Sequence, residues 1–185
     1  MKTPPIIKTR RLILRLANEK DVEGIVKFLQ ENDEHFAPWE PIRGEKYYTG
    51  DYWRKNILND WQEFLNGKSV RLFMFEKTLI GVIHFSNIVR GPFQSCLLGY
   101  KLGMMYEGKG YMFEALEASI DYMFTELNLH RIEANYIPRN ERSKKVLDRL
   151  GFRIFGEEDD YLMIAGKWEK HIRTSLINRE WIKHS

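Results

Sequence analysis

Cysteine is almost absent from this sequence. Cys96 is the only one among 185 residues, which excludes a disulfide framework and a cysteine-based metal site and favours a reducing compartment. Cys96 lies in an apolar stretch, so we expect a small core residue and not a nucleophile. Long apolar runs are missing as well: none approaches the roughly 20 residues that cross a bilayer, and the first residues lack the apolar core of a signal peptide. We therefore expect a cytoplasmic protein without a membrane segment.

A strong charge of one sign is also lacking. The 29 Lys and Arg residues nearly balance the 26 Asp and Glu residues, for a formal net charge of +3. Because the basic residues are scattered, nucleic acid is not expected as the main ligand. The histidines lack the paired spacing of metal ligands, so no metal site is expected. They are His35, His84, His130, His171 and His184.

What is present is enough for one folded domain over 1–185, since 43% of the residues are hydrophobic. Apolar periodicity predicts helices over 19–30, 51–65, 111–127 and between Asn140 and Gly151. It predicts strands over 10–16, 70–75, 79–87, 96–102, 130–137 and 168–177, and two short strands, 152–155 and 161–165, joined by an acidic turn. A loop rich in proline and aromatic residues is expected over 35–48. This order predicts a mixed α/β sheet.

The stretch 102–114 stands at a strand-to-helix junction and contains two glycines, Gly108 and Gly110. Glycines let the backbone turn there and expose its amides, and a helix start attracts phosphate. A P-loop needs Ser or Thr where Gly110 stands, and the dinucleotide fingerprint needs glycine where Phe113 stands. The residues leave two readings: a main-chain phosphate site over 107–112, or a glycine-rich turn without a ligand.

Several separated motifs then resemble a known family. The Gly-Lys-Gly turn before a long helix, and Asn140-x-x-Ser143 opening a helix that closes in Leu150-Gly151-Phe152, are similar to the GNAT N-acetyltransferases. Further motifs are typical of the RimJ/RimL-like branch, the ribosomal-protein-alanine N-acetyltransferases, and closest to its RimJ members. These motifs are Thr9-x-Arg11-Leu12-x-Leu14-Arg15, Pro38-Trp39-Glu40-Pro41, Phe85-Ser86-Asn87-x-Val89-Arg90-Gly91, His130-Arg131-Ile132-x-Ala134-Asn135-Tyr136 and Gly166-Lys167-Trp168.

The resemblance implies a GNAT-like acyl-CoA N-acyltransferase fold. Its mixed, strongly twisted sheet is flanked by helices and has a V-shaped split between the strands 96–102 and 130–137. Acetyl-CoA would be the co-substrate, with its pyrophosphate at the glycine turn and no metal. The family's usual Gln or Arg before the turn is replaced by Met105. The implied cofactor-binding residues are Leu102, Gly103, Met104, Glu107, Gly108, Lys109, Gly110, Tyr111, Met112, Asn140 and Ser143.

The resemblance also implies the reaction. The acetyl group would pass directly, in a ternary complex, to the N-terminal α-amino group of a protein, a ribosomal one. The partners would be that protein and the ribosome or a pre-ribosome, and the chain would be a monomer or a homodimer. Main-chain amides near 103–105, freed by a bulge, would stabilise the oxyanion. The residues implied for the acceptor side are Trp39, Glu40 and Asn87.

Side-chain roles follow the family less closely. Leu147 stands where the family has its leaving-group tyrosine, and Ser143 resembles the serine that replaces it; its other reading is a helix cap. Asn140 would bond the pantetheine arm or serve as a plain N-cap. Asn135 stands where related enzymes have an acidic residue, and Glu133, on the same strand face, is the first candidate for the base.

Two further acidic residues are candidates for the base. Glu40 would act as the base or bind the acceptor's ammonium, whereas Glu114 is read mainly as a charge favoured at a helix start. A small-amine acetyltransferase, for a polyamine or an aminoglycoside, remains an alternative, because the stretch 39–52 mixes acidic and basic residues. So does a non-catalytic acetyl-CoA-binding ribosome-assembly factor, for which Ser143→Ala would change nothing.

Overall fold

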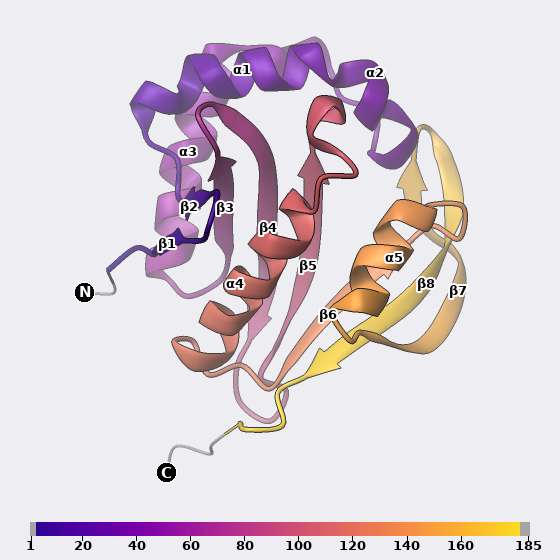
Figure 1. The fold of residues 1–185 in the computed structure, drawn as a ribbon. Coiled ribbons are helices and arrows are strands. Elements are labelled where there is room, and N and C mark those ends of the chain that lie inside the picture. Colours follow the sequence, from indigo (N-terminus) through magenta and orange to yellow (C-terminus); the bar gives the residue numbers. More distant parts are fainter. Residues whose placement is uncertain (1–2, 182–185) are drawn as a thin grey trace.

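The computed structural model describes residues 3–181, so that His184 lies outside it. Eight strands form one sheet in the order β1-β2-β3-β4-β5-β6-β8-β7, shown in Figure 1. Every neighbouring pair is antiparallel except β5 and β6. The strands are β1 (Ile6–Lys8), β2 (Ile13–Arg15), β3 (Val70–Phe75), β4 (Leu79–Val89), β5 (Ser95–Leu102), β6 (Arg131–Tyr136), β7 (Arg153–Ile164) and β8 (Lys167–Ile177).

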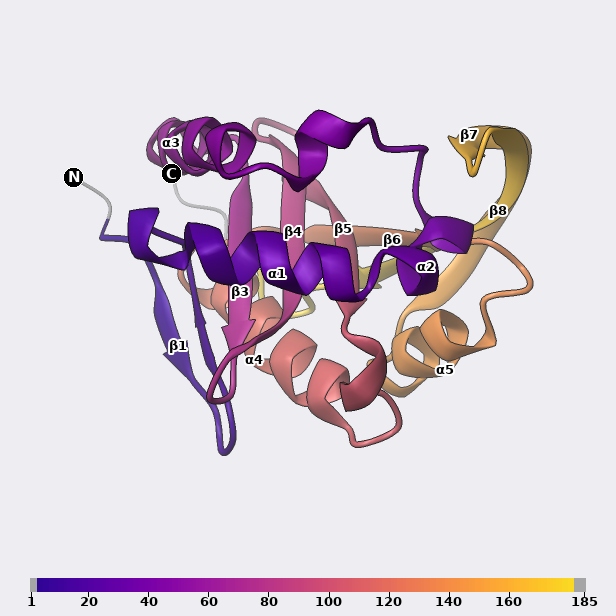
Figure 2. The ribbon, with the colours of Figure 1, turned by 90° about the horizontal axis from the view of Figure 1, so that it is seen from above.

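Helices cover both faces of the sheet. They are α1 (Val22–Glu31), α2 (Asp33–Phe36), α3 (Gly50–Leu65), α4 (Tyr111–Thr125) and α5 (Glu141–Arg149). The view from above shows α4 and α5 on one side and α3 on the other (Figure 2). One buried cluster joins α4 and α5 to the sheet through Leu116, Met123 and Leu147. A second joins α1 and α3 to Phe73. The apolar stripe of the helix predicted over 111–127 is thus core, as its spacing indicated.

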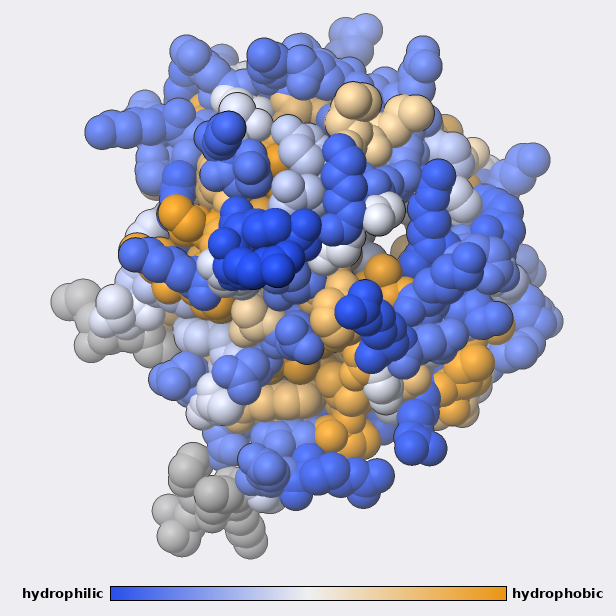
Figure 3. Space-filling model, viewed as in Figure 1, coloured by the Kyte–Doolittle hydropathy of each residue, from blue (hydrophilic) through white to orange (hydrophobic). Residues whose placement is uncertain are grey.

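The predicted V-shaped split lies between β5 and β6. These strands pair only from Ser95 opposite Arg131 to Leu97 opposite Glu133, although β5 continues to Leu102 and β6 to Tyr136. Beyond that point β5 remains paired with β4 and β6 with β8. Each strand keeps one paired edge, and the two edges that face the split are open. Figure 3 shows the surface hollowed beside α5 in this region.

Three predicted strands are different in the structure. Within the segment 10–16 only Ile13–Arg15 (β2) is a strand, and it is the second strand of a hairpin. The Thr9 amide closes the turn of this hairpin by donating to Leu12 O at 2.9 Å. The Arg11 amide instead donates to Glu114 Oε1 at 2.8 Å. The two short strands 152–155 and 161–165 are one strand, β7, with a bulge at Asp160 (φ 49°). β7 is an edge strand exposed on most of its length, so its backbone pairing with β8 maintains it without an apolar face.

The loop predicted over 35–48 is also partly regular. It contains the end of α2 and two 3-10 turns, Ala37–Trp39 and Glu45–Tyr48. Phe36 is buried in the cluster under α1 and α3, and Tyr47 packs against that cluster. The loop is therefore tied to the core by its aromatic residues, which fixes the polar side chains between them.

Candidate active site

The glycine turn ends β5 and begins α4. Gly108 and Gly110 have φ values of 71° and 76°, a region that glycine enters without strain. Gly110 is the N-cap of α4 and no side chain caps this helix start. A Cβ at Gly108 would meet nothing within 4 Å. Open space above uncapped amides at the positive end of a 15-residue helix suits a phosphate group.

Side chains around the turn are held by ion pairs. Glu107 contacts His35 Nε2 at 3.2 Å and Arg142 Nη1 at 2.9 Å. These two partners come from α2 and α5, on either side of the split. Lys109 Nζ donates to Met105 O at 2.7 Å, and the Met105 side chain is exposed. The turn therefore offers its backbone to a ligand, while its charged side chains connect neighbouring elements.

The next residues along α4 have structural contacts. The Arg11 guanidinium lies 4.1 Å from the centre of the Tyr111 ring, and Met112 is buried, so Met112 would offer a ligand only its amide. Glu114 accepts bonds from Thr9 Oγ1 at 2.6 Å and Arg11 Nε at 2.7 Å. Burial opposes ionisation of Glu114, but these bonds outweigh it and lower its pKa. Glu114 thus anchors the N-terminal hairpin to α4.

The amides expected to be free near 103–105 are in part used by the protein. The Gly103 amide donates to Ile80 O at 2.8 Å, and the Met104 amide donates to Asn32 Oδ1 at 2.9 Å. The prediction was therefore wrong for both. In an antiparallel pair, backbone groups alternate between the two sides of the strand. Since Gly103 points its amide to β4, the amide of Leu102 points to the split.

Ser143 lies on the first turn of α5, and its hydroxyl is 2.7 Å from the Tyr100 hydroxyl. The backbone amide of Ser143 donates to Asn140 Oδ1 at 3.1 Å. Asn140 is thus the N-cap of α5, which confirms one of the two interpretations of this residue. The Ser143 hydroxyl is directed to β5. Burial raises the pKa of Tyr100 to about 12, against the effect of its bond with Ser143, so the phenol stays protonated at neutral pH.

Tyr100 is the residue that the sequence did not reveal. It lies within an apolar strand segment, 43 residues before its partner Ser143, and no local motif joins them. The bond connects β5 to α5, on opposite sides of the split. Leu147, at the position of the family's tyrosine, carries no hydroxyl and is buried in the core. Tyr100 brings a phenol to Ser143 from another element.

The candidate residues divide between the two faces of the sheet. Tyr100 packs in the cluster beneath α4 and α5. Lys101, its neighbour on β5, has its side chain on the opposite face, since side chains alternate along a strand. On β6 the residues Ile132, Ala134 and Tyr136 belong to the first cluster, which leaves Glu133 and Asn135 on the opposite face. A Cβ on Gly99 would meet nothing within 4 Å, so this face of β5 is open beside Lys101.

Glu133 is buried and engaged with two guanidinium groups. Its Oε1 accepts from Arg131 Nε at 2.7 Å, and its Oε2 lies 3.5 Å from Arg173 Nη2. Glu133 is opposite Leu97, the last pair before β5 and β6 separate. Its neighbour Asn135 donates to Tyr161 Oη at 3.0 Å, and the buried Asn135 Oδ1 has no hydrogen-bond partner among the described residues.

Replacement of Glu133 by glutamine tests its two roles. The ion pairs favour a structural role, so we expect Glu133→Gln to lower the free energy of unfolding by about 2 kcal/mol, because two half-buried arginines lose the buried counter-charge of Glu133. Urea denaturation measures this loss. Glu157→Gln, which removes an exposed partner of Lys170, is the control and should change stability little. A normal stability with a loss of kcat that grows towards low pH would instead identify Glu133 as the base.

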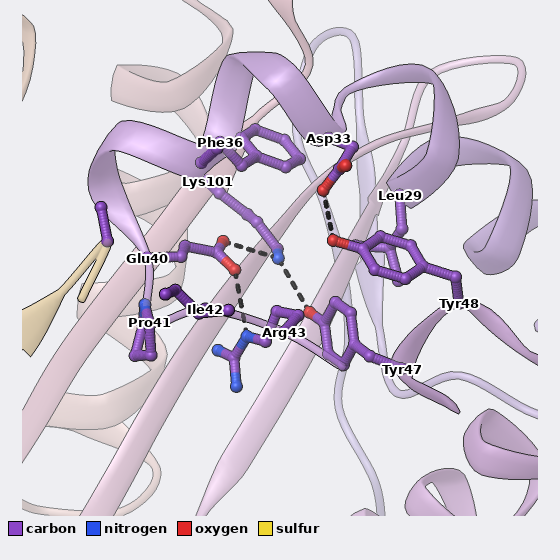
Figure 4. A pocket seen from close by; sticks show the side chains of 12 residues that line it. Leu29, Asp33, Phe36, Glu40, Pro41, Ile42, Arg43, Tyr47, Tyr48 and Lys101 are labelled. Atoms are coloured by element: carbon purple, nitrogen blue, oxygen red, sulfur yellow. Dashed lines mark hydrogen bonds and ion pairs between the residues drawn. The ribbon is translucent and has the colours of Figure 1, made fainter. Parts of the chain in front are cut away.

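Trp39 and Glu40 lie where the proline-rich loop reaches the segment after β6 and the turn between β7 and β8. Arg139, which follows β6, lies 5.6 Å from the centre of the Trp39 ring. The Glu40 carbonyl accepts from the Ala165 amide at 2.9 Å. Its carboxylate points into a cavity of about 290 Å³ and contacts Lys101 Nζ at 2.7 Å, as Figure 4 shows. Glu40 therefore lies on the face of the sheet that carries Lys101, and Trp39 contacts Arg139 beside it.

Asn87 is not brought together with the other candidates. It occupies the irregularity between Ser86 and Val89 in the pairing of β4 with β5, with a φ of 51°. Ser86 pairs with Leu97, so Asn87 lies beside the end of β5 at which the split is closed. Its left-handed backbone, which asparagine tolerates well, accounts for the residue type there.

Residues 3–181 contain neither a metal-binding cluster nor a membrane-spanning helix. Within residues 3–181, no three His, Cys, Asp or Glu side chains are grouped so as to hold a metal ion. No helix in this range combines the length and the apolar character that a bilayer requires. Cys96 is buried, and burial raises its pKa to about 12, as expected for a thiol in the core.

Comparison with known proteins agrees with this geometry. Residues 11–153 match the family described as acetyltransferase (GNAT) domain. The chain is 41% identical over 180 residues to [ribosomal protein uS5]-alanine N-acetyltransferase of Escherichia coli, covering 95% of this chain and 92% of that protein. The crystal structure of ribosomal-protein-S5-alanine acetyltransferase from Vibrio fischeri matches with a TM-score of 0.93 and 38% identity, over 98% of this chain and 100% of that one.

A second solved structure is that of Mycobacterium smegmatis RimJ in complex with CoA-disulfide. It matches with a TM-score of 0.89 and 25% identity, over 98% of this chain and 90% of that one. The sheet with its split, the glycine turn and these similarities lead to one conclusion. The chain belongs to the GNAT acetyltransferase family and is an acetyltransferase.

Proposed function

We propose that this enzyme transfers the acetyl group of acetyl-CoA to the N-terminal α-amino group of a ribosomal protein. Its similarity to the uS5-alanine N-acetyltransferase of Escherichia coli, at 41% identity over 95% of the chain, supports this acceptor. The geometry that carries the proposal is the division of the site between the two faces of the sheet, which the split connects. The glycine turn and Ser143 lie on the side of α4 and α5, whereas Glu40 and Lys101 face the opposite side.

The two sides suit two substrates that meet in the split. The backbone over 107–112 would hold the pyrophosphate of acetyl-CoA, and Asn140 Nδ2 is the part of that side chain left for the pantetheine arm, since Oδ1 caps α5. The acceptor would enter past Trp39 and Glu40. This arrangement supports a direct transfer, because an amine could approach a thioester in the split from the open face beside Gly99.

In the reaction, the neutral amine attacks the thioester carbonyl carbon. A C–N bond forms, the C–S bond breaks, and the amine gives up a proton. The Leu102 amide, directed to the split, would stabilise the oxyanion. The Ser143 hydroxyl would protonate the departing thiolate while it accepts a hydrogen bond from Tyr100. For removal of the amine proton, Glu133 with Asn135, or Glu40, would act through water.

Acetyl transfer to defined peptides tests this function. We expect the protein, incubated with acetyl-CoA, to acetylate peptides that begin with alanine, serine or methionine, and mass spectrometry to locate the acetyl group on the α-amine. The control peptide has a blocked α-amine and an internal lysine, and should remain unmodified. Acetylation of lysine side chains or spermidine alone would contradict the proposal. Binding of acetyl-CoA without transfer to any acceptor would support the assembly-factor alternative.

A further inference from the structure

A half-buried ammonium group, that of Lys101, lies in the pocket on the acceptor side. Lys101 Nζ contacts Glu40 Oε1 at 2.7 Å and the Tyr47 hydroxyl at 3.1 Å. It also lies 4.9 Å from the centre of the Phe36 ring. The Lys101 side chain is only 17% exposed. A carboxylate, a hydroxyl and an aromatic face therefore hold the charge of Lys101 in one position, as Figure 4 shows.

The charges that line this pocket are balanced. It contains two carboxylates, those of Asp33 and Glu40, and two cations, Arg43 and Lys101. Glu40 Oε2 lies 3.6 Å from Arg43 Nε, and Asp33 accepts a hydrogen bond from the Tyr48 hydroxyl. Each carboxylate therefore already has a partner within the protein. A site for a polycationic ligand would instead present unpaired carboxylates.

Lys101 is also close to the point of transfer. It directly precedes Leu102, whose amide points to the split, and its side chain lies on the face from which an acceptor amine would arrive. A fixed positive charge here acts on every acceptor. The reacting amine of a peptide is neutral and carries no second charge nearby. A polyamine keeps other ammonium groups when its reacting amine loses its proton, and these would be repelled.

We propose that Lys101 determines acceptor specificity. Its ammonium occupies the Glu40 carboxylate and repels polyamines, so that the pocket admits acceptors with a single amine and an uncharged neighbourhood, such as a protein N-terminus. This inference rests on the proposed function, since it assigns the basis of selectivity to the same site. Glu40 and Arg43 shape the pocket, and the charge of Lys101 makes the pocket select protein N-termini over polyamines.

Acceptor competition tests the proposal. The ratio of kcat/KM for spermidine to that for an alanine-terminated peptide is measured in the natural protein, Lys101→Met and Lys101→Arg. In Lys101→Met the repelling charge is gone and Glu40 keeps only Arg43, so the ratio should rise by about tenfold or more. Lys101→Arg retains the charge and should keep the ratio low. Lys46→Met removes an exposed lysine of the loop that carries Glu40 and is the control for net charge.

The outcomes separate this inference from the proposed function. A ratio that is the same in Lys101→Met and in the natural protein would overturn it while leaving peptide acetylation intact. A natural protein that prefers spermidine to the peptide would overturn both. Thermal unfolding of each variant verifies that it is folded. Because a ratio of two acceptors on one enzyme cancels the fraction of active protein, partial misfolding of Lys101→Met would not produce the expected rise.

Discussion

Replacement of Ser143 by alanine is expected to lower kcat about 100-fold, the range of one lost proton-transfer group. The thiolate would then leave without a donor, while the helix is unaffected, because Asn140 caps α5 through the backbone amide of Ser143. The affinity for CoA, measured by calorimetry, should change little. Ser119→Ala, which removes another buried hydroxyl, one bonded to Leu116 O within α4, is the control. Unchanged kcat in Ser143→Ala would contradict the role of Ser143.

Tyr100→Phe extends this test to the second hydroxyl. Because the Tyr100 phenol is 2.7 Å from the Ser143 hydroxyl, its loss leaves that hydroxyl without orientation, and we expect kcat to fall about tenfold. The double variant Tyr100→Phe/Ser143→Ala should be no slower than Ser143→Ala alone, since the phenol acts through the serine. Additive losses in this cycle would show that Tyr100 acts independently. Tyr122→Phe, in the same core cluster, is the matched control.

Replacement of Gly110 by valine is expected to raise the Kd of CoA by about tenfold or more. Gly110 has a φ of 76°, where a β-branched residue is strongly disfavoured, so the turn has to rearrange. The amides at the start of α4 would then no longer converge on one point. Calorimetric titration with CoA measures the change, and near-ultraviolet circular dichroism verifies the fold.

The control for this turn is a glycine without the special conformation. Gly156 lies on β7, and a Cβ there would meet nothing within 4 Å; its φ is not among the positive ones. Gly156→Ala should therefore leave the affinity for CoA unchanged. If Gly110→Val bound CoA as tightly as the natural protein, the phosphate site would have to be elsewhere than at the start of α4.

Local patterns predicted the elements that depend on local interactions. The glycine turn and the cap at Asn140 were confirmed. The split sheet, which the family resemblance implied, was confirmed as well. The patterns failed where backbone hydrogen bonds, and not the spacing of side chains, decided the extent of a strand. The Arg11 amide and guanidinium donate to Glu114 and not to a neighbouring strand. β7 continues past its acidic bulge because it pairs with β8 both before and after the bulge. Glu114 lies 103 residues from Arg11 in the chain. β8 follows β7 directly, but periodicity reads side chains and not the backbone pairing that carries β7 past its bulge.

The sequence by itself determined the family, the position of the glycine turn and the strand face that Glu133 shares with Asn135. Those features follow from short motifs and from the alternation of side chains along a strand. Only the tertiary structure decided which groups are free to react. Ile80 and Asn32 take the amides of Gly103 and Met104 and leave that of Leu102. Ser143 meets Tyr100, and Lys101 meets Glu40, across 43 and 61 residues. A hydrogen bond depends on distance in space, which the chain sets only when it folds.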